Sequence, residues 1–304
     1  MTAYIVRRLV QSVGVILGVS LVVFIFARIS GDPAALLLSV YASAEDVARF
    51  RTLLGLDKPL PVQFWTFLTN AVRGDFGTSF QYHLPALGLV LERMPATIQL
   101  TVASMLLATI LGVPAGIISA VRRHSLLDQV SMTVAMLGQA MPTFWLGIVL
   151  VLLFAVNLHV LPSAGGGSIR HLILPSVTLG AFSAASIARL TRSAMVEVLM
   201  RDYVRTARAK GLAEQTVLVR HALRNAAIPI ITVIGLQTGA LLGGAVVTET
   251  IFAWPGVGSL AIRAVTTRDY PLVQACVFVV AVGFVLINTI LDIAYQWLDP
   301  RIRL

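Results

Sequence analysis

The side chains that most often carry chemistry are few in this sequence, and their spacing matches no catalytic or ligand-binding pattern. Neither lysine, Lys58 or Lys210, follows the Gly-x-x-x-x-Gly spacing of a phosphate-binding loop. The 5 histidines are scattered without a His-Glu-x-x-His pair, and Cys276 is the only cysteine, so a metal cluster and an intrachain disulfide are both disfavoured. A Gly-x-Ser-x-Gly nucleophile motif is also absent. We therefore expect no catalytic centre, cofactor site or metal site within this chain.

The most informative segment is a basic stretch, residues 195–227, between two long apolar runs. Its first part, residues 195–210, predicts a helix, and Gly211 predicts a left-handed cap or tight turn. A second helix is expected over residues 213–229. The corner is slim, because small residues precede the glycine: Thr206, Ala207 and Ala209. Such a hairpin suits insertion into a groove on a partner, while a solvated basic loop is the alternative that the residues alone leave open.

The elements that must position this hairpin are membrane-spanning helices. The chain has 304 residues, of which 57% are hydrophobic and 12% charged, against about 45–50% and about 25% in soluble domains. This excludes a water-soluble globular protein and a disordered chain. A spanning helix needs about 20 apolar residues, and six stretches qualify: 9–28, 97–121, 131–156, 172–194, 228–248 and 273–297. We predict an all-α polytopic membrane protein whose first stretch is a retained span, because it is longer than the apolar core of a signal peptide.

The charges predict the orientation of these spans. Six spans place both termini on one side, together with the loops near 122–130 and 195–227. That side carries most of the arginines and a strong net positive charge, whereas the other side is nearly neutral. By the positive-inside rule, both termini are expected to be cytoplasmic. The net charge of +9 therefore reflects orientation, and nucleic-acid binding is not needed to explain it.

The segments between the spans divide the chain into three parts. Residues 1–28 form the N-terminal cytoplasmic end and the first span, residues 29–96 a small helical cap on the outer face, and residues 97–304 the remaining spans with the loop 195–227. Within the cap, residues 62–72 place aromatic and aliphatic side chains among polar ones, as an interfacial helix would.

Small residues recur at intervals of four in three spans. In membranes such stripes let helix backbones approach closely. The fifth span carries Gly235, Gly239 and Gly243, and similar stripes lie in the second and fourth spans. Ordinary packing within one chain is one interpretation, and contact with a second permease subunit, most readily by the fifth span, is the other.

Ionisable side chains are missing from the middle of every span. This disfavours a proton-coupled carrier, because such carriers need buried ionisable groups. Polar side chains that could line a translocation pathway are Gln139, Gln237 and Thr238, although a hydrogen bond between or within helices is an equally simple role for them.

Several motifs together resemble one family. The segment from Asp202 to Leu212, with residues 220–226 and Pro229, is similar to the cytoplasmic coupling loop of ABC importer permeases. Within that family, the chain most resembles the first-permease (B-type) subunits of the branch that transports dipeptides, oligopeptides, glutathione and nickel. The supporting motifs cover nearly the whole chain: Arg7-Arg8, Gly31-Asp32-Pro33, Leu54-Gly55-Leu56-Asp57-Lys58-Pro59, Gly74-Asp75-Phe76-Gly77, Trp254-Pro255-Gly256-Val257-Gly258, Arg268-Asp269-Tyr270-Pro271 and Asp299-Pro300-Arg301-Ile302-Arg303.

The coupling loop departs from the wider family pattern, which begins Glu-Ala-Ala and has a glycine four residues after the second alanine. This chain keeps Ala207 and Gly211, has Arg205 and Thr206 in the first two places, and has its proline later, at Pro229. Such departures are common in the peptide and nickel branch.

The resemblance implies a type I importer in a bacterial cytoplasmic (inner) membrane. A homologous second permease subunit would pair with this chain, and two cytoplasmic ATPase subunits would bind ATP and Mg²⁺. An extracytoplasmic binding protein would deliver the substrate to the periplasmic face. Di- or oligopeptides are the expected substrates, with glutathione or a nickel chelate as the alternative. The residues expected at the ATPase contact are Arg205, Thr206, Ala207, Arg208, Ala209, Lys210, Gly211 and Leu212.

The outer cap and the loop from Trp254 to Pro271 are expected to meet the binding protein, with interfacial anchoring as the alternative for Phe252, Trp254 and Tyr270. Two other classes of function remain. A gradient-driven carrier or a channel would move solute without any ATPase, and an assembly protein would be dispensable to a working transporter.

Overall fold

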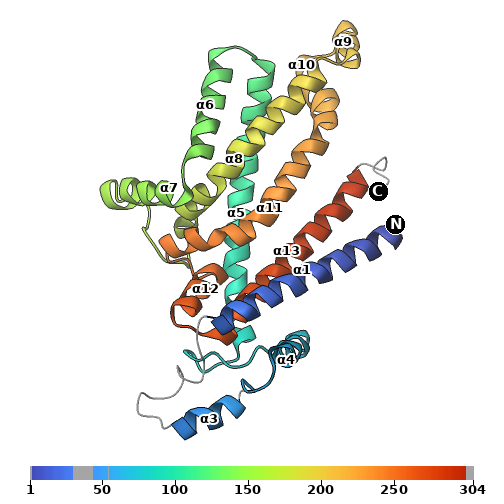
Figure 1. The fold of residues 1–304 in the computed structure, drawn as a ribbon. Helices are drawn as coiled ribbons and strands as arrows, with labels where there is room; N and C mark the ends of the chain where they lie inside the picture. Colours follow the sequence, from blue (N-terminus) through green and yellow to red (C-terminus); the bar gives the residue numbers. More distant parts are fainter. Residues whose placement is uncertain (1, 30–43, 54, 299–304) are drawn as a thin grey trace. The chain divides into compact units, whose positions relative to one another are not determined.

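The computed structural model describes residues 2–29, 44–53 and 55–298, and these are almost entirely helical (Figure 1). The all-α class is therefore confirmed. Motif residues 31–33, 54 and 299–303 lie outside the described residues. The elements are α1 (Thr2–Ile29), α3 (Ala44–Leu53), α4 (Leu60–Val72), α5 (Ala86–Val121), α6 (Leu126–Ala140), α7 (Thr143–Leu150), the π-helix η1 (Val151–Asn157), α8 (Ile169–Leu199), α9 (Asp202–Ala209), α10 (Glu214–Thr216), the π-helix η2 (Val217–Leu223), α11 (Arg224–Ile251), α12 (Val257–Thr266) and α13 (Tyr270–Leu298).

Among the described residues, four helices are long and apolar enough to cross a membrane. They are α5, α8, the continuous helix Glu214–Ile251 and α13 as far as Leu291. The first predicted span lies in α1, whose apolar part, Val10–Phe26, is shorter. Six spans are compatible with these helices, although length and composition alone account for four or five.

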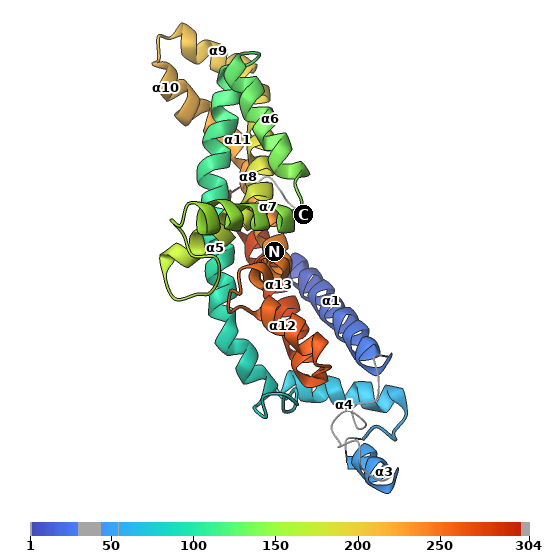
Figure 2. The same ribbon diagram turned by 90° about the vertical axis from the view of Figure 1, so that its left-hand side faces the viewer.

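The third predicted span, residues 131–156, is not one straight helix. Its two parts, Leu126–Ala140 and Thr143–Asn157, are bent by 104° at the break between them, and Figure 2 shows α7 running across the direction of α6. The cause is Pro142, which has no N–H to donate and disfavours helical backbone in the residue before it. Accordingly, Met141 is extended, with φ −75° and ψ 127°.

The chain forms two compact units. One contains residues Met1–Ala96 and Pro255–Val285, and the other contains Thr97–Trp254 and Leu286–Leu304. The second unit is built around α8, which packs against α6, α7 and α11 and buries twelve of its residues.

Helices α5 and α8 meet through the glycines of two of the predicted stripes. A Cβ atom on Gly116 would lie 2.5 Å from the carbonyl oxygen of Ala188, and one on Gly112 would lie 2.7 Å from that of Ala184. On α8, a Cβ atom on Gly180 would lie 2.8 Å from the carbonyl oxygen of Ser104. Both stripes therefore serve packing inside this chain, where backbone approaches backbone.

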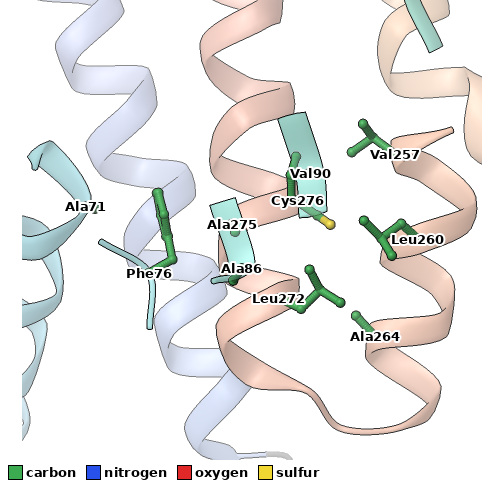
Figure 3. Close-up of a cluster of buried hydrophobic side chains, with 10 residues drawn as sticks. All are labelled: Ala71, Phe76, Ala86, Val90, Val257, Leu260, Ala264, Leu272, Ala275 and Cys276. Carbon is green, nitrogen blue, oxygen red and sulfur yellow. The ribbon is translucent and has the colours of Figure 1, made fainter. Parts of the chain in front are cut away.

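The first unit has its own apolar core. Ala71, Phe76, Ala86 and Val90 contribute one part, and the hairpin of α12 and α13 contributes the rest. Figure 3 shows Leu260 and Ala264 of α12 facing Leu272 and Cys276 of α13. The single cysteine is therefore a buried packing residue.

Replacing Gly116 with alanine is expected to destabilise the protein by about 1–3 kcal/mol, because the new methyl group meets backbone that cannot move aside. Thermal unfolding of the detergent-solubilised protein measures this. The matched control is Gly244→Ala on α11, which has nothing within 4 Å of its Cβ position. Equal shifts in Tm for both variants would contradict this account of the α5–α8 contact.

Candidate functional site

The basic segment 195–227 forms a helical hairpin at one end of the second unit (Figure 1). The single helix predicted over residues 195–210 is wrong, because α8 continues to Leu199 and α9 begins anew at Asp202. Between them Arg201 is extended, with φ −74° and ψ 147°. This break redirects the chain, so that one face of α9 can pack back onto the end of α8.

The turn after α9 has the left-handed glycine that the sequence predicts. Gly211 has φ +76°. Its N–H donates to the carbonyl of Arg208 at 2.9 Å, and the next N–H, of Leu212, donates to Ala207 at 3.4 Å. This pair of bonds is a Schellman motif, which satisfies the last carbonyls of a helix. A Cβ atom at Gly211 would have nothing within 4 Å, so the constraint on this residue within the chain is backbone conformation alone.

The inward face of α9 is small and apolar. Val204 and Ala207 are buried with Val217 of η2, and Val198 and Leu199 of α8 pack against them. Ala207 is 6% exposed. Of the residues predicted to contact an ATPase, Ala207 thus faces this chain's own interior and positions α9.

One ion pair closes the hairpin on its outer side. Arg208 donates from Nη2 to Glu214 Oε1 at 2.7 Å and from Nε to Oε2 at 3.1 Å. The hydrogen bond to Glu214 raises the pKa of the Arg208 guanidinium above its ordinary value. Both side chains are about half exposed, so the pair contributes at most about 1 kcal/mol and mainly fixes the geometry of the turn.

The outward face of the hairpin is polar and accessible. Its exposed residues include Tyr203, Arg205, Thr206, Arg208, Ala209, Lys210, Gly211 and Leu212. Tyr203 was not among the predicted contact residues, although a lone aromatic side chain in a short charged helix was a signal for it. This face offers an aromatic ring, cationic groups and a slim corner.

The second arm of the hairpin leads directly into a span. The second helix, predicted over residues 213–229, continues without a break into the span: residues 214–251 form one helix, and Pro229 lies inside α11. The arm contains the π-helix η2, a rare form that often occurs at functional sites. Within η2, Val217 contacts α9, whereas Ala222 packs with Ala120 of α5 and Met195 of α8. These contacts connect α9 to the spans through η2 and the end of α8.

An ion pair beside this end of α8, with a buried carboxylate and a partly exposed arginine, was not predicted. Asp128 of α6 is 4% exposed and accepts hydrogen bonds from Arg192 Nε at 2.7 Å and Nη2 at 2.8 Å. The hydroxyl of Ser119 and the backbone N–H of His124 also donate to it. One carboxylate thus joins the end of α5, the start of α6 and the end of α8.

The predicted pathway residues are dispersed. Gln139 lies on α6, just before the break at Pro142, and Gln237 and Thr238 lie on α11, all three half-buried. The Thr238 hydroxyl donates to the carbonyl of Ile234 at 2.8 Å, within its own helix. Another acidic side chain, Glu249, is fully buried near the end of α11 and accepts a hydrogen bond from Thr97 of α5 at 2.7 Å.

The glycine stripe predicted for contact with a second permease is not uniformly accessible. Gly235 and Gly239 are buried, whereas Gly243 is exposed and has nothing within 4 Å of its Cβ position. Only the part of the stripe around Gly243 is therefore open to another subunit.

The loop from Trp254 to Pro271, predicted to contact the binding protein, contains a buried carboxylate that fixes its conformation in the first unit. Asp269 accepts hydrogen bonds from the Ser79 hydroxyl and from the backbone N–H groups of Gln81 and Leu272. The ring of Phe80 meets that of Tyr270 edge-on, with centroids 6.5 Å apart. Two motifs distant in the sequence are joined in this way.

The roles suggested for three aromatic residues are wrong. Phe252, Trp254 and Tyr270 are 1%, 3% and 7% exposed. Buried rings can neither anchor the protein at a lipid interface nor touch a binding protein. Among the described residues, no group of three or more His, Cys, Asp or Glu side chains is placed to hold a metal ion.

Comparison with known proteins gives consistent results across the chain. Residues 112–304 match the model of the family described as "Binding-protein-dependent transport system inner membrane component", and residues 1–101 match the model of its N-terminal region. The glutathione transport system permease proteins GsiC of Escherichia coli K12 and Salmonella typhi are each 45% identical over 304 residues, covering 100% of this chain and 99% of the relative.

Two solved structures resemble the fold. A chain of the MetNI methionine ABC transporter in an inward-facing conformation has a TM-score of 0.58 at 18% identity, covering 69% of this chain and 96% of that one. A chain of an amino acid ABC transporter with histidines has a TM-score of 0.55 at 15% identity, covering 69% and 94%.

Replacing Val204 with alanine is expected to loosen α9, because it removes two buried carbon atoms and leaves a cavity. If the substitution destabilises the packed hairpin by about 1.4 kcal/mol, the population of molecules with an opened hairpin rises about tenfold. Limited trypsin digestion of the solubilised protein measures this as faster cleavage after Arg205 and Lys210. The control is Thr206→Ala, which removes a hydroxyl and a methyl group from an exposed residue whose hydroxyl is bonded within its own helix. If both variants were cleaved at the rate of the unaltered protein, the proposed packing of α9 would be excluded.

Proposed function

The chain belongs to the family of binding-protein-dependent transport system inner membrane components, the permease subunits of ABC importers, and from this premise we propose that its hairpin, residues 201–214, is the docking element for a cytoplasmic ATPase. The observation that carries this proposal is the division of α9 into two faces. Val204 and Ala207 fix α9 to the ends of two membrane helices, while Tyr203, Arg205 and Lys210 remain exposed.

The hairpin suits the transmission of force better than catalysis. Its side chains form no catalytic arrangement. The energy for uphill import comes from hydrolysis of ATP, which two separate ATPase subunits bind together with Mg²⁺. Docking of an ATPase moves α9, and the contacts of η2 and α8 carry that movement to α5 and α11. Rocking of the spans then alternates access to the two sides of the membrane.

The orientation follows from the charges. Both termini and the hairpin face the cytoplasm, because their side of the membrane carries most of the arginines. The opposite face, including the loop around Ser79 and Asp269, then meets an extracytoplasmic binding protein. A second, homologous permease completes the pathway, and Gly243 lies on the open part of the helix stripe that could meet it.

The substrate that we infer is glutathione, or a peptide of similar size. The support is the 45% identity over the full chain to permeases named for glutathione transport. Di- and oligopeptides remain the second candidate, because they share with glutathione a backbone of amides and a free carboxylate. A nickel chelate is the third and has no specific support among the residues described above.

Replacing Gly211 with valine is expected to uncouple the transporter. A β-branched residue is strained at φ +76° by about 1–2 kcal/mol or more, so the turn after α9 should distort. In the reconstituted complete transporter, ATP-driven uptake and substrate-stimulated ATPase activity should both fall strongly, while the amount of this subunit in the membrane is unchanged.

The control for this experiment is Gly211→Asn, since asparagine tolerates the left-handed conformation. It should retain most of the uptake, and it separates backbone strain from added bulk at an open position. Normal uptake and normal stimulated ATPase activity in the valine variant would rule out the docking role.

The substrate is tested on the intact complex. Uptake of labelled glutathione by proteoliposomes containing the complete transporter and its binding protein should be saturable, and a dipeptide should compete poorly. Mass spectrometry of the small molecule that copurifies with the complex gives an independent answer. Strong competition by dipeptides, with a peptide as the copurified ligand, would reassign the protein to peptide import. Transport by this chain without any ATPase would exclude the importer itself and favour a gradient-driven carrier.

A further inference from the structure

Helix α4 is an uncharged amphipathic helix bounded by charges at both ends. Its thirteen residues, Leu60–Val72, contain no Asp, Glu, Lys or Arg. Asp57 and Lys58 precede it, Arg73 and Asp75 follow it, and all four are exposed. A short apolar helix with charged flanks is the pattern of a helix that lies along a membrane surface.

One face of α4 is occupied by the protein. Gln63 is buried and donates to the carbonyls of Leu56 at 3.1 Å and Lys58 at 2.6 Å, which fixes the start of the helix. The rings of Phe64 and Phe67 lie 5.3 and 6.1 Å from that of Phe24 in α1. The aromatic residues that could have been taken for lipid contacts are thus turned towards α1.

The opposite face of α4 is apolar and uncovered. Val62, Trp65 and Val72 are 45%, 69% and 85% exposed. Their spacing of three and seven residues places them on one side of a helix, together with Thr69. A tryptophan and two valines exposed to water would be unfavourable, so this face requires an apolar partner.

The contact with α1 indicates where that partner lies. Phe24 is five residues before the end of α1 at Ile29, a rise of about 7–8 Å along the helix axis. The guanidinium carbon of Arg28 lies 5.2 Å from the centre of the Phe24 ring, so a charged group lies beside the contact between α1 and α4. If α1 is the first span, α4 lies at the depth where acyl chains meet headgroups.

The exposed surface of α1 at the same end is also apolar. Val22, Ile25 and Phe26 are all exposed. Helix α1, a predicted membrane helix, and α4 are therefore in direct contact, and each carries an exposed apolar surface. We propose that the face of α4 formed by Val62, Trp65 and Val72 lies in the outer leaflet, in contact with phospholipid acyl chains, with Lys58 and Arg73 at the level of the phosphates.

This proposal extends the function proposed above and shares only its membrane topology. It assigns a lipid contact to the cap segment, whereas the family comparison identifies a transporter subunit and assigns no role to this helix. A helix held in the interface fixes the height of the segment that follows it, which includes Gly77 and Ser79, relative to the membrane surface.

The test uses the fluorescence of Trp65 in the complete transporter, reconstituted into nanodiscs of phosphatidylcholine and phosphatidylglycerol. Its contribution is the difference between the unaltered protein and Trp65→Phe, an exposed and conservative change. Lipids brominated near the headgroup should remove about half of this emission, and lipids brominated near the chain ends should remove less, as expected for an interfacial position. Trp254→Phe is the matched control, since Trp254 is 3% exposed and its emission should not respond to either lipid.

Two outcomes would overturn the proposal. Quenching of Trp65 by aqueous iodide and not by either brominated lipid would place this face in water. Insensitivity to iodide and to both lipids would show that another protein covers it. Uptake and stimulated ATPase activity, measured on the same samples, should be unchanged by Trp65→Phe, so a failure of the lipid contact is distinguishable from a failure of the transport function.

Discussion

The close approach of α5 and α8 is the constraint on which the second unit depends. In lipid, apolar side chains gain little by burial, so helices associate where their backbones can touch. Gly112, Gly116 and Gly180 allow that contact, and each has a backbone carbonyl of the other helix where a side chain would stand. Once α5 and α8 are joined, the end of α8 is fixed, and the Asp128–Arg192 ion pair, the Met195 contacts and the hairpin all follow from its position.

The hairpin combines a rigid attachment with an accessible surface. Its attachment is apolar and consists of a few small side chains, which suits a short helix that must not move independently of α8 and η2. Its surface is polar, cationic and free of catalytic groups. A rigidly attached element with an accessible polar surface agrees with membership in a family of importer permeases.

The first unit is organised by a buried carboxylate instead of by close contact between helix backbones. A single buried carboxylate, Asp269, organises a tight loop by accepting hydrogen bonds from Ser79, Gln81 and Leu272. Such a group is stable when buried because donors surround it. Aromatic side chains then fill the interior around α1, α4 and α13, where Phe67 and Phe76 link Phe24 to Phe278. Most aromatic residues described in this unit are therefore structural, although Phe26, Trp65 and Phe284 are exposed.

The sequence by itself determined the features that depend on local composition and backbone chemistry. Long apolar runs predict spans because the bilayer leaves no alternative to a helix, and Gly211 predicts a left-handed turn because other residues are strained there. Only the tertiary structure decided which side chains are covered. Spacing could not reveal that Ala207 faces inward, that Phe252 and Trp254 are buried, or that Asp128 meets Arg192 across 64 positions. The break at Arg201 belongs to the same class, because α9 turns back to pack against Val198, Leu199 and Val217, which lie outside it. The bend at Pro142, in contrast, has a local cause in the missing N–H of proline.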